Sequence, residues 1–298
     1  MSRNNRIFPE NIRKVAIVPI ASKAEKSLLS EALEFIGDQG VEVLYPAGKI
    51  NTPEEKAGYL EDIFKERKVD LIIAERGGYG SAEVCDVLNW EVLKGNSKPL
   101  LGYSDITFLH FAMLKFGCGV PIAGPVAVEL KKISESHYAS LTLFKALAEQ
   151  RTESMNILDF EINLEKNLKI IKEGVVNAPV IPANLTILTT VTGTRYLPGL
   201  SGAVLLLEDI AEPLYKIRRC LNNLRQSDIL SEISGLIFGS FSRCGDKHEL
   251  EKIFEQFAED VNGPVISNFR FGHCPFSLSI KTGKKILIDT SVFKVKNI

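Results

Sequence analysis

The chain has 298 residues, of which 45% are hydrophobic and 24% are charged. This composition is typical of a soluble globular protein and excludes general disorder. The formal net charge is −1, so no overall field recruits nucleic acid or an acidic membrane. A chain of this length exceeds one ordinary hydrophobic core and suits two cores of modest size.

The first apolar run is VAIVPI at 15–20. Pro19 interrupts it, and it is too short for a signal peptide or a membrane span. No other stretch approaches the ~20 apolar residues that a transmembrane helix needs. We therefore expect a buried first strand, no membrane partner and a cytoplasmic location.

The first half of the chain alternates strand and helix patterns. Apolar, β-branched runs predict strands, and apolar residues at helical spacing predict the helices between them. Gly40 is placed to end the first helix, and Thr52-Pro53 to begin the second. The strands are expected at 15–20, 41–46, 69–75 and 98–104, and the helices at 27–39, 52–68, 82–88 and 105–115. This rhythm predicts a doubly wound parallel sheet.

A change of character near residue 150 indicates a domain boundary. The polar stretch 151–177 is rich in Asn, Glu and Lys and is interpreted as a linker, with room for a hairpin or an edge strand. β-branched runs follow it, among them TILTTVTGT at 186–194, and amphipathic helices are expected at 214–227 and 247–260. We expect an α/β domain at 1–150 and a second, mixed α/β domain at 178–298.

The tetrapeptide GYSD at 102–105 lies where a strand ends and a helix begins. A serine there has its hydroxyl at the carboxyl edge of the sheet, where open α/β folds hold ligands. The N–H groups that follow it can donate to an oxyanion. The site resembles a nucleophile elbow, although Ile106 stands where G-x-S-x-G has its last glycine. Ser104 could instead serve only as the N-cap of the next helix.

The loop RGGYGS at 76–81 follows a strand at the same edge of the predicted sheet. Adjacent glycines let the backbone approach a ligand closely, so the loop could supply an oxyanion donor or cradle a phosphate. It matches neither the P-loop nor G-x-G-x-x-G. A tight strand–helix turn would explain the glycines equally well.

A serine nucleophile needs a base, and the chain has four histidines. His110 falls on the helix after Ser104 and is expected to point elsewhere, while His137 and His248 lie in charged segments that look like surface. His273 stands on a loop between Gly272 and Pro275 and is the best candidate. A structural role for this single loop histidine is equally open.

The base needs an orienting carboxylate, and Glu208 and Asp209 follow the very apolar run GAVLLL. A carboxylate at the end of a buried strand is costly unless it is paired or protonated, so a catalytic role or a buried salt bridge is expected. The five cysteines are odd in number and form no CxxC pair, which argues against disulfides and zinc. Cys274 is interpreted as a small packing residue.

Together these segments resemble the LD-carboxypeptidase (muramoyltetrapeptide carboxypeptidase) family of serine peptidases, nearly from end to end and in the same order. The match rests on RGGYGS at 76–81, PLLGYSDITFLHFAM at 99–113, GP at 124–125, ANLTIL at 183–188, GT at 193–194, LLLEDIAEPLYKIRRCLNNL at 205–224 and FGH at 271–273. The family includes microcin C self-immunity hydrolases.

The resemblance implies that Ser104 is the nucleophile, that His273 is the base and that Glu208 orients it. It implies an oxyanion hole from the N–H groups of Gly78 and Asp105, and a site in an interdomain cleft. It also implies a homodimer. The implied chemistry needs neither metal nor cofactor. As substrate contacts we expect Arg76, Gly77 and Tyr79, with Arg76 facing the substrate carboxylate.

Two departures from the family bear on the substrate. The family often has His-Gly-Pro where this chain has Ala123-Gly124-Pro125, and Gly-Gly-Asn-Leu where this chain has Pro182-Ala183-Asn184-Leu185. The expected reaction is release of D-alanine from a murein tetrapeptide during wall recycling. Alternatives are a microcin-type peptidyl- or aminoacyl-nucleotide hydrolase, which an aromatic such as Trp90 stacked on adenine would favour, and a non-catalytic ligand-binding protein.

Overall fold

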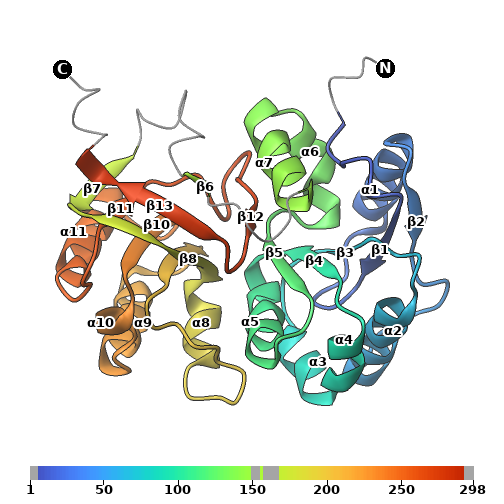
Figure 1. The fold of residues 1–298 in the computed structure, drawn as a ribbon, viewed down its shortest axis with the longest axis horizontal. Helices are drawn as coiled ribbons and strands as arrows, with labels where there is room; N and C mark the ends of the chain where they lie inside the picture. Colours follow the sequence, from blue (N-terminus) through green and yellow to red (C-terminus); the bar gives the residue numbers. More distant parts are fainter. Residues whose placement is uncertain (1–5, 149–154, 157–167, 292–298) are drawn as a thin grey trace. The chain divides into compact units, whose positions relative to one another are not determined.

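The computed structural model describes residues 6–148, 155–156 and 168–291. The chain forms two compact units (Figure 1). The first contains the residues up to 149 together with 195–198 and 276–281, and the second contains the remainder. Each unit combines helices with a sheet whose strands are mostly parallel, so the α/β prediction is confirmed.

The sheet of the first unit has the order β2-β1-β3-β4-β5-β12. Its strands are β1 (Lys14–Val18), β2 (Glu42–Leu44), β3 (Leu71–Ala74), β4 (Pro99–Gly102), β5 (Val120–Ala123) and β12 (Ile280–Lys281). All pairs are parallel except β12 with β5. Since β1 lies beside β3, the strand order reverses there, and open sheets of this kind bind ligands at the carboxyl ends of such strands.

Local signals in the sequence explain where the helices of this unit begin and end. They are α1 (Lys26–Asp38), α2 (Pro53–Lys65), α3 (Ser81–Val87), α4 (Trp90–Gly95), α5 (Thr107–Phe116), α6 (Leu130–Ser134) and α7 (His137–Ala148), with short 3-10 helices η2 (Ser104–Ile106) and η3 (Ala127–Glu129). Thr52 forms a capping box with Glu55 at the start of α2. Gly40 takes a φ of +76° just after α1, as expected of a glycine that ends a helix.

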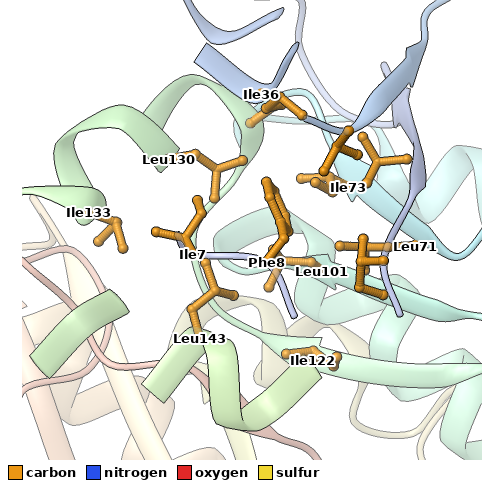
Figure 2. Close-up of a cluster of buried hydrophobic side chains, with 14 of the residues drawn as sticks. Ile7, Phe8, Ile36, Leu71, Ile73, Leu101, Ile122, Leu130, Ile133 and Leu143 are labelled. Atoms are coloured by element: carbon orange, nitrogen blue, oxygen red, sulfur yellow. The ribbon is translucent and has the colours of Figure 1, made fainter. Parts of the chain in front are cut away.

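One face of the first sheet carries a hydrophobic core (Figure 2). Alternate strand residues such as Leu71 and Ile73 point to this face, because side chains of a strand alternate between faces. Ile36 of α1 and Leu130 of α6 cover them, and Phe8 lies fully buried among them. This packing fixes the strands whose carboxyl ends carry the predicted site.

The second unit contains a seven-stranded sheet with the order β6-β13-β8-β9-β10-β11-β7. The strands are β6 (Met155–Asn156), β7 (Lys169–Lys172), β8 (Val175–Asn184), β9 (Val204–Ile210), β10 (Gly235–Ser242), β11 (Val265–Ser267) and β13 (Lys285–Asp289). The central strands β8, β9, β10 and β11 pair in parallel. Strand β9 has a parallel neighbour on each side, which agrees with its nearly continuous apolar sequence.

The helices of the second unit are α8 (Leu185–Val191), α9 (Leu214–Gln226), α10 (Ile229–Glu232) and α11 (Lys247–Ala258). The β-branched run at 186–194 therefore forms mainly a helix and not a strand. Asn184 explains this, because its side chain caps the helix by accepting from the N–H of Ile187. Within α8, the hydroxyls of Thr189 and Thr190 donate to carbonyls three residues earlier, those of Thr186 and Ile187.

Most of the stretch expected to be a linker, 151–177, lies outside the described residues. Its end contributes β7 and the beginning of β8 to the sheet of the second unit. Within the described ranges, no helix has the length and apolar character needed to cross a membrane.

Candidate active site

Ser104 stands at the turn from β4 into η2 and α5 with a φ of +63°. This left-handed conformation costs a non-glycine residue about 1–3 kcal/mol, and strained backbone of this kind clusters at functional sites. An N-cap residue has extended backbone angles, and neither η2 nor α5 has a side-chain cap. Ser104 is therefore not the helix cap that its sequence position also allowed.

The glycine loop lies directly against Ser104. A Cβ added at Gly77 would stand 3.1 Å from Ser104 Cβ and 3.2 Å from its Oγ, closer than side chains normally pack. Gly78 has a φ of +118°, and a Cβ there would meet Ser22 Oγ at 2.3 Å. The loop thus needs both glycines to approach the serine and the segment after β1.

Three further hydrogen bonds hold this loop. Ser22 Oγ accepts a hydrogen bond of 3.2 Å from the N–H of Tyr79. The fully buried Glu75, the last residue before the loop, accepts from the N–H of Ala24 at 2.6 Å and from the Tyr45 hydroxyl at 2.9 Å. Hydrogen bonds therefore join this loop and its first flanking residue to the segments that follow β1 and β2.

Asp105 follows Ser104 and is also buried. Its carboxylate accepts from the N–H of Ser81 at 2.9 Å, and its carbonyl accepts from the Ser81 hydroxyl at 2.6 Å. Burial raises the pKa of the Asp105 carboxyl, and the bonds from Ser81 lower it in part. The backbone N–H of Asp105 lies in the first turn of η2, where N–H groups have no acceptor within the helix.

In the second unit, Glu208 and His273 form a hydrogen-bonded pair. Glu208 is fully buried near the end of β9, and its Oε2 accepts from His273 Nδ1 at 2.7 Å and from the His273 backbone N–H at 3.1 Å. A neutral imidazole that donates from Nδ1 keeps its lone pair on Nε2, so this arrangement makes Nε2 the basic nitrogen.

The backbone around His273 is fixed at both sides. Gly272 has a φ of +97°, and a Cβ there would stand 2.5 Å from Glu208 Cβ and Oε2, so only glycine allows this approach. The carbonyl of His273 accepts from the hydroxyl of Ser240 at 3.2 Å and from that of Ser242. The histidine therefore has an orientation determined by its main chain as well as by its ring.

Asn184 links the two carboxylates at the end of β9. Its Nδ2 donates to Glu208 Oε1 at 3.0 Å and to Asp209 Oδ1 at 3.1 Å. Asp209 also accepts from the N–H and hydroxyl of Thr186 at the start of α8. Burial raises the pKa of the Asp209 carboxyl. Strand alternation sends Glu208 to His273 and Asp209 to Thr186, yet one amide group serves both.

The remaining histidines lie outside these clusters. His110 is buried in α5 and bonds through Nε2 to the carbonyl of Leu100 at 3.2 Å. Burial lowers the pKa of His110 to about 4, so it is neutral at pH 7. His137 and His248 are exposed. Over the described ranges, no cluster of three or more His, Cys, Asp or Glu residues could hold a metal ion.

The expected substrate contacts are at the surface of the first unit. Arg76 is exposed and donates from Nη1 to the carbonyl of Lys23 at 3.3 Å. Tyr79 is 68% exposed and donates to Glu83 at 2.8 Å. Trp90 instead packs against Phe116 and Tyr196, with ring centroids 4.7 and 6.3 Å away. This internal packing removes the argument that Trp90 stacks on a nucleotide.

The structure thus gathers Ser104, Asp105 and the glycine loop in one unit and pairs Glu208 with His273 in the other. The sequence analysis missed Ser81 and did not assign Asn184 a role. The position of Ser81 at the end of the loop RGGYGS was the only signal for it. Asn184 stood in the motif ANLTIL, and a polar residue that ends a long apolar strand is a usable signal for a buried network.

Comparisons with known proteins identify the family of both halves of the chain. Models of the LD-carboxypeptidase N-terminal domain and C-terminal domain match residues 15–122 and 177–288. The murein tetrapeptide carboxypeptidase of Pseudomonas aeruginosa is 29% identical over 301 residues, which cover 93% of either chain. A protein of Bacillus subtilis named probable murein peptide carboxypeptidase is 26% identical over 295 residues, 93% of this chain and 89% of its own.

Among solved structures, the wild-type apo form of the microcin C7 self-immunity protein MccF superposes with a TM-score of 0.83. The alignment covers 96% of this chain and 95% of MccF at 19% identity, so it bears on the fold alone. Both halves of the fold are therefore matched, and the chain belongs to the LD-carboxypeptidase family.

Proposed function

We propose that this protein is a serine LD-carboxypeptidase that releases the C-terminal D-amino acid from a murein tetrapeptide. The observation that carries the proposal is the pairing of a fully buried Glu208 with His273 Nδ1 at 2.7 Å. A carboxylate without solvent needs such a partner, and the partner is left with a basic Nε2. The names of the relatives in Pseudomonas aeruginosa and Bacillus subtilis support the substrate class.

The reaction begins when Ser104 Oγ attacks the carbonyl carbon of the scissile amide. His273 Nε2 accepts the serine proton, and Glu208 stabilises the imidazolium that forms. The N–H groups of Gly78 and Asp105 donate to the oxygen of the tetrahedral intermediate. Both segments adjoin Ser104, since Gly77 packs against its side chain and Asp105 follows it.

The intermediate collapses when the C–N bond breaks and His273 gives its proton to the leaving amine. The D-amino acid departs, and the remaining peptide is held as an ester on Ser104. A water then attacks this ester, His273 takes its proton, and the proton returns to Ser104 as the peptide leaves. For both half-reactions, Ser104 Oγ and His273 Nε2 must come within about 2.6–3.2 Å of each other.

Arg76 is the proposed partner of the substrate's terminal carboxylate. Its guanidinium is exposed beside the glycine loop and can offer two parallel N–H donors. Gly77 and Tyr79 flank the same position, so the loop would contact the substrate near the leaving residue. The proposal also includes a homodimer, which the resemblance to the family implies, and the cytoplasmic location expected from the sequence.

Release of D-alanine tests the proposal. Purified protein is incubated with a murein tetrapeptide that ends in D-alanine, and free D-alanine is measured over time. The controls are the diastereomer that ends in L-alanine, for which free L-alanine is measured and no release is expected, and the variant Ser104→Ala, which should release D-alanine at least about 10³-fold more slowly. A wild-type enzyme that leaves the peptide intact but cleaves an aminoacyl-nucleotide would overturn the substrate assignment and support a microcin-type activity.

A further inference from the structure

Ser81 joins the two backbone segments that carry the proposed oxyanion donors. It is the first residue of α3, just after the glycine loop, and it is fully buried. Its N–H donates to Asp105 Oδ2 and its hydroxyl to the Asp105 carbonyl, at 2.9 and 2.6 Å. Two hydrogen bonds therefore tie the turn that follows Ser104 to the loop that contains Gly78.

These hydrogen bonds matter because an oxyanion hole works only when its N–H donors stand at the right distance from the oxyanion. Donors act when they stand about 2.7–3.1 Å from the developing oxyanion. Gly78 and Asp105 belong to loops that follow different strands, β3 and β4. Strand pairing sets the register of these strands only as far as their ends, at Ala74 and Gly102. Beyond them, the contacts between Ser81 and Asp105 fix the separation of the two loops.

The chemistry of Asp105 agrees with a positioning role. The N-cap of α3 is Gly80, which has no side chain to accept from the first turn, so Asp105 supplies the acceptor from another element. Burial of this carboxylate is unfavourable and raises its pKa, whereas the hydrogen bonds from Ser81 and, to a smaller extent, the charge of Lys56 lower that pKa in part. Lys56 itself is held by the carbonyls of Ile20 and Ala21 after β1.

We propose that Ser81 and Asp105 are positioning residues that hold the Gly78 and Asp105 N–H donors in register on the oxyanion. This inference rests on the proposed function and names what sets the geometry of its transition state. It requires the loss of these bonds to weaken transition-state binding more than substrate binding, because the donors contact the tetrahedral oxygen and not the planar carbonyl.

The test compares Ser81→Ala with wild type for D-alanine release and for inhibition by a peptide boronate, whose tetrahedral adduct places an oxygen where the oxyanion forms. We expect kcat to fall about 10- to 100-fold with KM changed less than about threefold, since a misplaced donor costs less than a deleted one. The boronate should weaken by about the same factor as kcat/KM. Ser81→Thr keeps the hydroxyl and should restore most of the rate.

Thr142→Ala is the matched control for a purely structural effect. Thr142 is also buried in the first unit, and its hydroxyl accepts from the N–H of Ser279 at 3.0 Å. This variant should lower Tm without changing kcat or boronate affinity. If Ser81→Ala does not fold, Ser81→Cys, which keeps the size of the side chain and a weak donor, is measured instead.

Three outcomes are distinguishable. Normal kcat and boronate affinity in folded Ser81→Ala, or in Ser81→Cys where Ser81→Ala does not fold, would overturn the positioning role; an inactive Ser104→Ala would leave the serine mechanism standing. Loss of kcat together with boronate affinity supports the role. Full activity of Ser104→Ala would show that the proposed function itself fails, whatever Ser81 does.

Discussion

Glu208→Gln changes one oxygen of the buried carboxylate into an NH2 group, and the surrounding hydrogen bonds determine the effect. Three donors converge on Glu208: the backbone N–H and Nδ1 of His273 on Oε2, and Nδ2 of Asn184 on Oε1. If the glutamine oxygen faces His273, its NH2 group meets the NH2 group of Asn184. If the NH2 group faces His273, it meets the backbone N–H, which cannot become an acceptor.

Asn184 cannot resolve the first clash by rotating its amide. Its Oδ1 accepts from the N–H of Ile187, and its Nδ2 donates to Asp209 as well as to Glu208. Each orientation of the glutamine therefore leaves at least one buried donor without an acceptor. Such a loss costs about 1–3 kcal/mol of stability.

The catalytic loss should be larger than the loss of stability. Without the carboxylate, the imidazolium lacks its counter-charge and Nδ1–H lacks its strong acceptor, so kcat should fall by about 10²- to 10⁴-fold. Asp209→Asn is the matched control, because Asp209 is equally buried and shares Asn184 but bonds to Thr186 instead of the histidine. It should lower Tm with a much smaller effect on kcat.

The assay is the rate of D-alanine release at saturating substrate, together with Tm and far-UV circular dichroism for each variant. A folded Glu208→Gln enzyme with kcat within about threefold of wild type would refute the assignment, because a neutral amide at this position leaves the imidazolium without its counter-charge. A larger kcat loss in Asp209→Asn would reverse the roles of the two residues.

Four other expectations follow from the same contacts. Ser104→Ala should reduce turnover by about 10³-fold or more. Ser104→Gly should be equally inactive, but its free energy of unfolding in urea should exceed that of Ser104→Ala by about 1 kcal/mol, because glycine adopts the left-handed φ without strain. Activity close to that of wild type in either variant would contradict the assignment of Ser104 as the nucleophile. Turnover should persist in EDTA and be lost in His273→Ala, whereas strict dependence on added metal would rule out this mechanism. Gly272→Ala should lower both kcat and Tm, because its Cβ would meet Glu208 at 2.5 Å, and unchanged kinetics would mean that this approach is not needed. Burial lowers the pKa of His110 to about 4, while a histidine in the unfolded chain has a pKa near 6.5, so the unfolded state binds more protons between these two pH values. The free energy of unfolding should therefore fall by about 2 kcal/mol from pH 7 to pH 5. His110→Gln should remove that fall.

Local chemistry made much of the first unit predictable. The alternation of apolar runs with amphipathic stretches located β1 to β4 and the helices between them, and Thr52 and Gly40 marked helix ends that the structure contains. Strand β12 carried no such signal. It consists of two residues, and its pairing with β5 depends on the chain's return to the first unit after residue 275.

Residues of the candidate site that belong to a sequence motif could be predicted. Residues whose role depends on a contact in the folded structure were harder to predict. GYSD and FGH pointed to Ser104 and His273, but the conformation of Ser104, which separates an elbow from a helix cap, exists only in three dimensions. The stretch after Asn184 is β-branched and yet helical, because a side-chain cap combined with a buried helix face outweighs β propensity. Ser81 was missed because its partner lies 24 residues away.

The two short segments 195–198 and 276–281 have a consequence for how the protein is made. Both complete the first unit: Tyr196 bonds to Asp86 at 2.6 Å, and β12 covers the edge of β5. During synthesis the ribosome releases residues up to 149 long before residue 281. Until β12 has been synthesised, the edge of β5 in the nascent first unit therefore has no partner strand, and an unpaired edge is a site for mispairing with other chains. We expect a fragment that ends at residue 149 to aggregate, and slow translation to leave β5 open to chaperones until the last strands emerge.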